Sequence, residues 1–256
     1  MTNKDKTQKH TNIHYKGYED FIARIEDYLQ KIETQYKVFT PFLTMDKQVI
    51  LKRYIGKKYV VSFFGGYEQA ENKMACIAYE VCSSPYPMVC LKATYHKVYD
   101  MLTHQDVYGA LMNIGLNRQQ FGDIVVKDGF IYLYTTTQSK HIIINQLTKI
   151  KHCYVVFEES TDVVEKKQDF EYRVHYIVSF RLDVLVSCIT HLARDKAKKI
   201  IQSGSVKVDH IPLVESNYIC NNECILSIRG YGRFKVMYTM RKTRSNRFCV
   251  NIAKFK

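Results

Sequence analysis

The stretch that decides the fold is RLDVLVSCITHLARDKAKKIIQSGSVKVD, residues 181–209, which combines apolar side chains at helical spacing with many basic ones. At 100° per residue, the apolar side chains fall into one stripe on each of two successive helices. The stripes consist of Leu182, Leu185, Val186 and Ile189, and then of Ala193, Ala197, Ile200 and Ile201. The stretch therefore predicts two core helices, the second with an exposed basic edge that includes Arg194, Lys196 and Lys199.

Charge is distributed unevenly along the 256 residues. Residues 173–256 carry 16 Lys and Arg against 5 Asp and Glu, a net of +11, whereas residues 1–172 carry 22 against 20, a net of +2. After Glu223 there are nine Lys and Arg and no acidic residue. A nearly neutral body with a basic C-terminal third favours a nucleic-acid partner. An anionic membrane fits less well, because it selects an amphipathic helix and the acid-free tail is patterned as strands.

Periodicity indicates an α+β fold that begins with a helical and strand unit over residues 1–87. A polar lead over 1–14 precedes a long amphipathic helix over 18–36. A short helix over 46–54 follows, with Asp46 as candidate N-cap, and two buried strands complete the unit.

Residues 88–160 follow the order βαββαβ, the ferredoxin-like plan of RRM domains. Thr103 and Asp106 resemble a capping box at the start of the first helix, and the second helix is expected over 139–150. CYVVFEE, residues 153–159, is expected to close the domain as one strand.

The polar residues 161–172 indicate a linker, and residues 173–256 form the third unit. This unit is expected to begin with a strand over 173–180, to continue through the two helices and to end in a basic hairpin. No stretch approaches the ~18 apolar residues that span a bilayer, and the N-terminus lacks the apolar segment of a secretory signal. We therefore expect a cytoplasmic protein with reduced cysteines and no membrane partner.

Residues 181–209 resemble the S4 domain, an RNA-binding module also found in heat-shock protein 15 and beside pseudouridine synthases. The S4 pattern is Arg-Leu-Asp, a helix, Ser/Thr-Arg-x-x-Ala and Ile-x-x-Gly-x-Val-x-Val-Asn. Here Ala193 stands for the usual Ser or Thr and Asp209 for the usual Asn, and neither change removes a positive charge. The resemblance implies that Arg181 and Arg194 are the principal RNA contacts, since a planar guanidinium can bridge two phosphate oxygens.

Three further segments extend the resemblance to the YlmH-type S4 RNA-binding proteins of bacteria: FFGGYEQAENK (63–73), LTHQDVYGALMNIGLNRQQFGDIVV (102–126) and SIRGYGRFKV (227–236). This family implies a C-terminal S4 domain behind an RRM-like middle domain. It also implies rRNA binding on the large ribosomal subunit, with tRNA as a second candidate partner, and rescue of obstructed subunits that hold peptidyl-tRNA. We expect a monomer that needs no cofactor. The expected RNA-binding residues are Arg181, Arg194, Lys196, Lys199, Lys207, Arg229, Arg233 and Lys235.

Two other functions compete with this interpretation. RLD also surrounds the catalytic Asp of pseudouridine synthases, which makes an RNA-modifying enzyme one alternative. Only 73 residues follow Asp183, however, so we expect this carboxylate to belong to the start of the helix rather than to a catalytic domain. The other alternative is a cell-division adaptor protein that uses the basic third as an anchor.

Other residue groups have both a functional and a structural interpretation, and the structural one is preferred for each. Cys220 and Cys224 have metal-ligand spacing but no second pair nearby. Gly65 and Gly66 suit a tight turn better than a phosphate-binding loop. The remaining groups are the strand residues Phe130, Tyr132 and Tyr134, whose face either stacks on bases or is covered by the N-terminal helices, and His104, Asp106, Arg118 and Asp123, which either catalyse or fix helix ends and loops.

Overall fold

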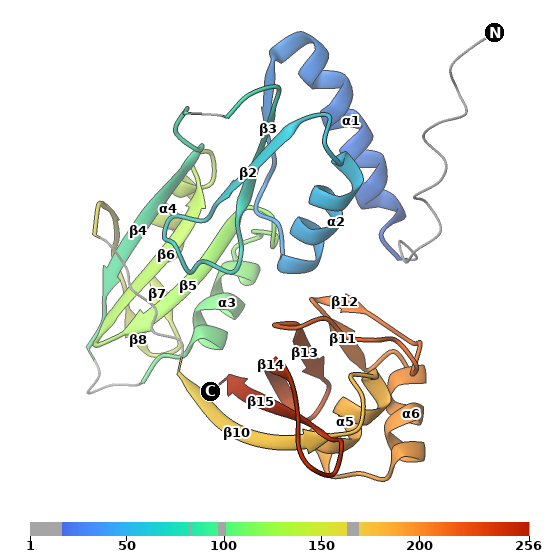
Figure 1. Ribbon diagram of the computed structural model, residues 1–256. Helices are drawn as coiled ribbons and strands as arrows, with labels where there is room; N and C mark the ends of the chain where they lie inside the picture. Colours follow the sequence, from blue (N-terminus) through green and yellow to red (C-terminus); the bar gives the residue numbers. More distant parts are fainter. Residues whose placement is uncertain (1–16, 82, 97–100, 163–168, 256) are drawn as a thin grey trace, which may run out of the picture. The chain divides into compact units, whose positions relative to one another are not determined.

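A computed structural model describes residues 17–81, 83–96, 101–162 and 169–255 of the chain (Figure 1). The polar lead expected over 1–14 and half of the linker expected over 161–172 lie outside these ranges. The chain forms two compact units, residues 15–166 and residues 167–256. Both contain helices and antiparallel sheets, which confirms the α+β class.

The first part of the 15–166 unit is a three-stranded sheet in the order β1-β3-β2 with two helices. The predicted long helix is confirmed, and its Ile25 and Ile32 are fully buried. Asp46 is not an N-cap: Thr44 has the extended backbone of that position, and Asp46 lies in the first turn, where it accepts a hydrogen bond from the Tyr18 hydroxyl at 2.6 Å. The elements are α1 (Glu19–Gln35), β1 (Lys37–Phe39), α2 (Met45–Ile55), β2 (Val60–Phe64) and β3 (Met74–Ala78).

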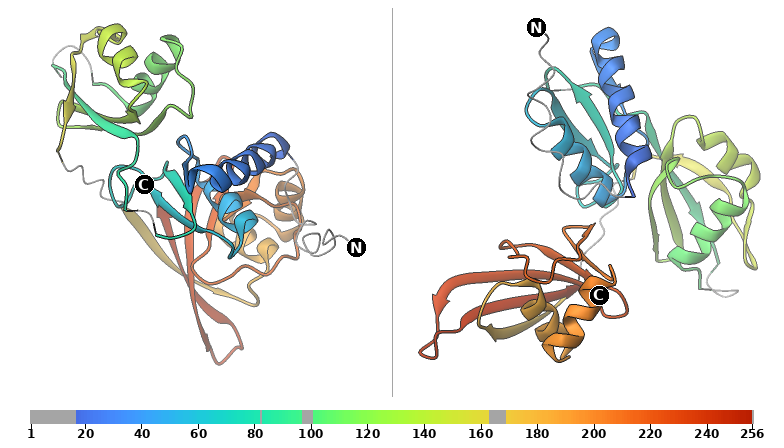
Figure 2. Two further views of the ribbon diagram at one scale, coloured as in Figure 1. Left: turned by 90° about the horizontal axis from the view of Figure 1, so that it is seen from above. Right: turned by 90° about the vertical axis from the view of Figure 1, so that its right-hand side faces the viewer.

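The second part of this unit has the predicted order βαββαβ in a four-stranded sheet, β5-β6-β4-β9. Its two helices cover one face of the sheet (Figure 2), and the capping box of Thr103 and Asp106 is present. The elements are β4 (Met88–Thr94), α3 (His104–Asn113), β5 (Phe121–Lys127), β6 (Phe130–Thr136), α4 (Lys140–Gln146), β7 (Lys149–Ile150), β8 (Cys153–Tyr154) and β9 (Phe157–Ser160).

Two expected boundaries in this part are wrong. The helix expected over 139–150 ends at Gln146, and CYVVFEE is not one strand. Its beginning pairs with β7 in a hairpin that turns through Lys151 at φ 50, and its end pairs with β4 as β9. The helix ends earlier because Leu147, with φ −89 and ψ 74, lies outside the helical region, so α4 stops at Gln146.

A loop between β2 and β3 joins the two parts of the 15–166 unit. Gly66 has φ 98, and a Cβ on it would approach a ring carbon of Tyr134 to 2.0 Å, so only glycine fits there. The buried Asp123 carboxylate on β5 accepts hydrogen bonds from the Tyr67 hydroxyl at 2.8 Å, from the backbone of Glu71 and Asn72 at 2.8 and 3.0 Å, and from the Asn72 amide at 2.6 Å. The glycines and Asp123 therefore fix a loop onto the sheet, as their structural interpretation predicted.

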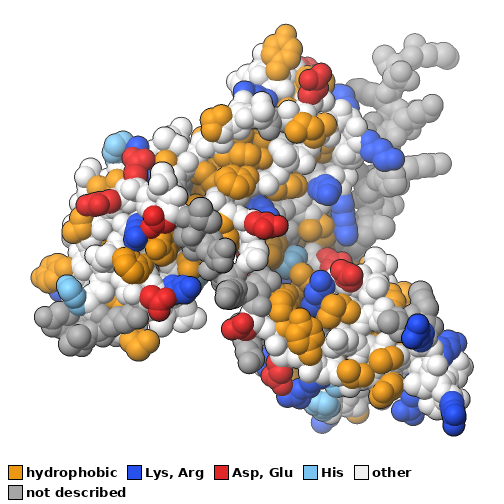
Figure 3. All heavy atoms as spheres, turned by 60° about the vertical axis from the view of Figure 1, so that its left-hand side comes forward, with side chains coloured by type: hydrophobic (Ala, Val, Ile, Leu, Met, Phe, Trp, Pro, Cys, Tyr) orange, Lys and Arg blue, Asp and Glu red, His pale blue; other side chains and the backbone are white. Residues whose placement is uncertain are grey.

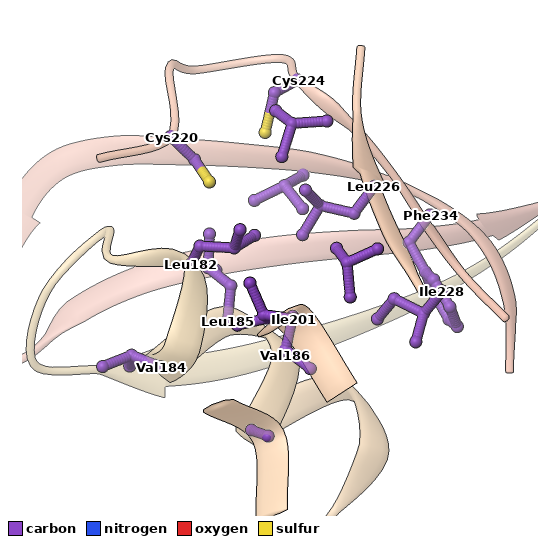
Figure 4. Close-up of a cluster of buried hydrophobic side chains, with 14 of the residues drawn as sticks. Leu182, Val184, Leu185, Val186, Ile201, Cys220, Cys224, Leu226, Ile228 and Phe234 are labelled. Carbon is purple, nitrogen blue, oxygen red and sulfur yellow. The ribbon is translucent and has the colours of Figure 1, made fainter. Parts of the chain in front are cut away.

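The 167–256 unit is a six-stranded sheet, β10-β15-β14-β13-β11-β12, with α5 and α6 packed on one face. Apolar side chains from both helices and the sheet form its core (Figure 4). β10 begins three residues before the expected strand, within the segment predicted as a linker. The elements are β10 (Phe170–Ile177), α5 (Leu182–Thr190), α6 (Arg194–Gln202), β11 (Val206–Val208), β12 (Ile211–Pro212), β13 (Ile225–Ile228), β14 (Gly232–Lys242) and β15 (Phe248–Phe255).

In α6, Ala197 and Ile201 are fully buried, whereas Ile200 is half-buried and Ala193 is the exposed N-cap. The predicted stripe is therefore narrower than expected, because the helix begins at Arg194. No helix in the described ranges combines the length and the apolar character needed to cross a bilayer.

Candidate nucleic-acid interface

A buried carboxylate at the start of α5 holds two arginines. Arg181 donates from Nε to Asp183 Oδ1 at 3.0 Å and from Nη2 to Oδ2 at 3.2 Å, and Arg194 donates from Nη2 to Oδ2 at 2.7 Å. The Asp183 side chain is 0% exposed, whereas those of Arg181 and Arg194 are 37% and 51% exposed. We call these three residues the Asp183 clamp. It brings together the two arginines that the sequence analysis ranked first.

Local structure explains why residues 11 positions apart meet at one carboxylate. Arg181 is the N-cap of α5, and Asp183 lies in the first turn of that helix. α5 ends at His191 in the left-handed region, with φ 57, and the Ser187 hydroxyl donates to the Leu192 carbonyl at 2.6 Å. This short turn reverses the chain and starts α6 at Arg194, so that its guanidinium reaches back to the start of α5.

The clamp stays ionised. Burial alone would raise the pKa of Asp183, but the hydrogen bonds and positive charges of Arg181 and Arg194 outweigh it and hold that pKa below its usual value. An arginine has five N–H donors, and Asp183 occupies two from Arg181 and one from Arg194. The remaining donors belong to half-exposed groups of fixed orientation, which suits bidentate contact with phosphate.

The lysines of α6 differ in their surroundings. Lys196 and Lys199 are exposed, and neither forms an ion pair with another residue in the described ranges. Lys198 is half-buried and lies 3.2 Å from Asp195 Oδ1. Lys196 and Lys199 can therefore meet an external anion without breaking an internal contact, and Lys198 cannot.

The other four expected contact residues lie elsewhere in the unit. Arg229 is exposed in the turn after β13, and its backbone N–H donates to the Ser205 carbonyl. Lys207 and Arg233 both align with Ser227, from β11 and β14, so their side chains point away from the helix-covered core. Lys235, two residues after Arg233, shares that face. The expected RNA-binding residues therefore lie in two places: some in the helices α5 and α6, and others on the face of the sheet that these helices do not cover.

The aromatic strand β6 of the middle domain is covered over part of its length. Tyr134 is buried against Tyr67, with ring centroids 5.5 Å apart, so the cover is the loop after β2 and not the N-terminal helices that we expected. Phe130 and Tyr132 are half-buried, and the Lys92 ammonium lies 4.6 and 5.5 Å from their ring centroids. That ammonium also pairs with Asp162 at 2.6 Å.

Comparison with known proteins assigns the chain. A family model described as "Putative RNA-binding domain in YlmH" matches residues 83–163. A Bacillus subtilis (strain 168) protein named ribosome-associated protein quality control protein P2 is 30% identical over 243 residues, covering 92% of this chain and 95% of that protein. The chain belongs to the YlmH family. A solved structure, cell division protein ylmH from Streptococcus pneumoniae, matches with TM-score 0.47 and 22% identity over 55% of this chain and 89% of that one.

Membership in the YlmH family confirms the resemblance found from the sequence and the expectation of an RNA-binding protein. The family match also locates an RNA-binding domain at residues 83–163, where the charge balance gave no signal. The sequence signal for RNA binding lay in the basic third, because residues 1–172 carry nearly equal numbers of basic and acidic residues. The alternating aromatic residues of β6 were the available signal for the domain at 83–163.

Two further candidate sites have structural roles. Cys220 and Cys224 lie side by side in the core of the 167–256 unit, and a mutual hydrogen bond together with burial raises the pKa of Cys220 (Figure 4). Within the described ranges, no group of three or more His, Cys, Asp or Glu side chains is arranged to hold a metal. Asp183 lies in the first turn of α5, as expected, where both of its oxygens accept hydrogen bonds from arginines and its side chain is 0% exposed.

Proposed function

We propose that this YlmH-family chain is a non-catalytic factor that binds rRNA and tRNA on the large ribosomal subunit and acts in the rescue of obstructed subunits carrying peptidyl-tRNA. The observation that carries the proposal is the Asp183 clamp, which fixes two half-exposed guanidinium groups; Lys196 and Lys199 add two exposed ammonium groups on α6. The name of the Bacillus subtilis relative, a ribosome-associated quality control protein, supports the ribosomal setting.

The binding step is electrostatic. Each phosphate that Arg181, Arg194, Lys196 or Lys199 neutralises releases condensed counterions, so affinity falls as salt rises, with a slope of roughly −0.7 to −0.9 per contact in a plot of log affinity against log salt. The fixed arginines also add specificity, because a planar guanidinium group can donate two parallel hydrogen bonds to two phosphate oxygens. No step of this task forms or breaks a covalent bond.

Sedimentation of cell extract through a sucrose gradient tests the ribosomal setting. We expect the wild-type protein to co-migrate with free large subunits, and a Lys196→Glu/Lys199→Glu variant to move to the top of the gradient. Lys198→Glu is the matched control, since it changes the same helix at a residue that already pairs with Asp195. Co-migration with small subunits alone, or with no subunit, would contradict the proposal and favour an adaptor role.

A further inference from the structure

The six-stranded sheet of the 167–256 unit has one face covered by α5 and α6 and one face without a helix. Val206, Leu226, Phe234 and Ile252 point into the core under the helices. Because successive side chains of a strand alternate between faces, their neighbours point to the other side. We call that other side the open sheet face.

Strand register shows which residues meet on the open sheet face. One row runs from Tyr172 on β10 through Ala253 on β15 to Lys235 on β14. The next row runs from Phe170 through Phe255 to Arg233, Ser227 and Lys207. Aromatic residues thus occupy the β10 side of the face, and basic residues occupy its middle and its β11 side.

The edge strand β10 exposes an apolar stripe on this face. Tyr172, Val174 and Tyr176 are 59%, 58% and 56% exposed, and Val178, one residue after the strand ends, is 61% exposed. A contiguous apolar patch on an edge strand is an aggregation hazard and commonly marks an interaction site. In Figure 3, hydrophobic side chains gather on this unit around a Lys or Arg side chain.

The basic residues beside the stripe indicate which partner fits. Arg233 stacks its guanidinium 4.2 Å from the centroid of the Phe255 ring, and Lys235 makes only a loose pair with Glu223, at 3.5 Å. Lys207 is exposed and has no ion pair within the described ranges. The centre of a protein–protein interface is depleted in charge, whereas a platform for single-stranded nucleic acid combines aromatic rings with cations.

We propose that the open sheet face binds unpaired nucleotides of RNA, with bases stacked on Tyr172 and Tyr176 and phosphates near Lys207, Arg233 and Lys235. The inference rests on the proposed function and extends it, because the Asp183 clamp belongs to the helix layer on the other side of the sheet. The two tyrosines lie about 13 Å apart along the strand. Stacked bases are about 3.4 Å apart, so the two rings take separate bases of an extended strand.

The chain contains no tryptophan, so Tyr172→Trp places a single fluorescent reporter on this face. We expect a short unstructured oligouridine to quench that fluorescence, and a blunt RNA duplex at the same concentration to leave it nearly unchanged. A Tyr36→Trp variant is the matched control, since Tyr36 is 76% exposed in the other unit and lies outside the matched domain at residues 83–163. Its fluorescence should not respond to the oligouridine.

Anisotropy of labelled RNA gives the energetic test with the full-length protein. Tyr172→Ala and Tyr176→Ala should each weaken oligouridine binding about tenfold, whereas Tyr→Phe, which keeps the ring, should not. Lys196→Gln/Lys199→Gln should weaken duplex binding and spare oligouridine binding. If both Tyr→Ala variants bind oligouridine like wild type while duplex binding persists, the inference fails and the proposed function stands. If the wild type binds neither RNA, both fail.

Discussion

Two buried aspartates, one in each compact unit, differ in the kind of donor that binds their carboxylates. Asp123 in the 15–166 unit is bound by neutral donors: a tyrosine hydroxyl, two backbone N–H groups and an asparagine amide. Asp183 in the 167–256 unit is bound by two arginines. The neutral groups direct their N–H and O–H donors at Asp123. Each arginine, in contrast, has N–H donors that Asp183 does not bind, and its cationic group is half-exposed at the surface.

The comparison separates a structural carboxylate from an orienting one. The Asp123 network fastens a loop to a sheet and leaves its donors facing inward. The Asp183 clamp stabilises its helix pair and at the same time aims guanidinium groups at solvent. Substitutions at Asp123 should therefore change stability alone, whereas substitutions in the clamp should change stability and RNA affinity together.

The largest effect is expected for Arg181→Ala/Arg194→Ala. Removing both cations leaves the charge of Asp183 buried without a partner, and breaking a buried pair in this way costs roughly 3–5 kcal/mol. Urea unfolding of the 167–256 unit, followed by hydrogen exchange of α5 and α6, measures this cost. Loss of RNA binding by this variant would by itself be ambiguous, since misfolding would also remove it.

The triple variant Arg181→Ala/Asp183→Asn/Arg194→Ala resolves the ambiguity. It removes the buried charge with the arginines, so we expect most of the lost stability to return. RNA affinity should stay low, because the guanidinium groups are still missing. A triple variant that folds and binds structured RNA like wild type would show that the clamp serves stability only.

A smaller effect is expected for Asp123→Asn. The amide turns one acceptor position into a donor that faces the donors of Tyr67, Glu71 and Asn72, and a buried unsatisfied group costs roughly 1–3 kcal/mol. Hydrogen exchange should show faster opening of the loop at residues 65–72. RNA binding by Lys196 and Lys199, measured at fixed temperature below unfolding, should match wild type. A tenfold loss of duplex affinity in this variant would contradict the expectation that Asp123 affects stability alone.

The variant Arg181→Lys/Arg194→Lys keeps both positive charges but replaces the planar guanidinium groups with ammonium groups. A lysine can still neutralise Asp183, so the fold should persist. The ammonium cannot bridge two phosphate oxygens, so we expect about tenfold weaker binding to structured RNA with an unchanged salt slope. Filter binding at several salt concentrations measures both quantities. Wild-type affinity in the double variant would mean that charge alone decides binding.

Local patterns in the sequence were enough to predict α1, the βαββαβ order and the two helices of the basic third. Each of these elements depends on hydrophobic periodicity, which can be recognised in a short segment of the sequence. The capping box of Thr103 and Asp106 is local in the same way. The resemblance to the S4 pattern also singled out Arg181 and Arg194, and their contact with RNA stays a prediction.

Contacts between distant residues were not predictable from the same patterns. That Asp183 would hold both arginines depends on the turn at His191, and that Tyr134 would be covered depends on Gly66 fitting against its ring. The open sheet face depends on the register of β10 with β15, whose start at Phe170 lies in a segment that is polar enough to read as a linker. These features follow from tertiary pairing, which a single sequence does not specify.

The smallest loss of stability is expected at a third carboxylate, Asp106 at the start of α3. Asp106 accepts hydrogen bonds from the Thr103 hydroxyl and backbone N–H and pairs with Lys151 at 2.9 Å, and these contacts lower its pKa to about 2. Because the pKa is lower in the folded state, this group stabilises the fold fully above its usual value of 3.8, and the contribution is lost as pH falls toward about 2. Thr103→Ala removes the cap and should cost about 1 kcal/mol at neutral pH, less than either buried carboxylate. Hydrogen exchange in α3 at pH 6 and pH 3 measures both effects, and the difference between variant and wild type should shrink at the lower pH. An equal difference at both values would show that the Asp106 charge contributes nothing to the cap.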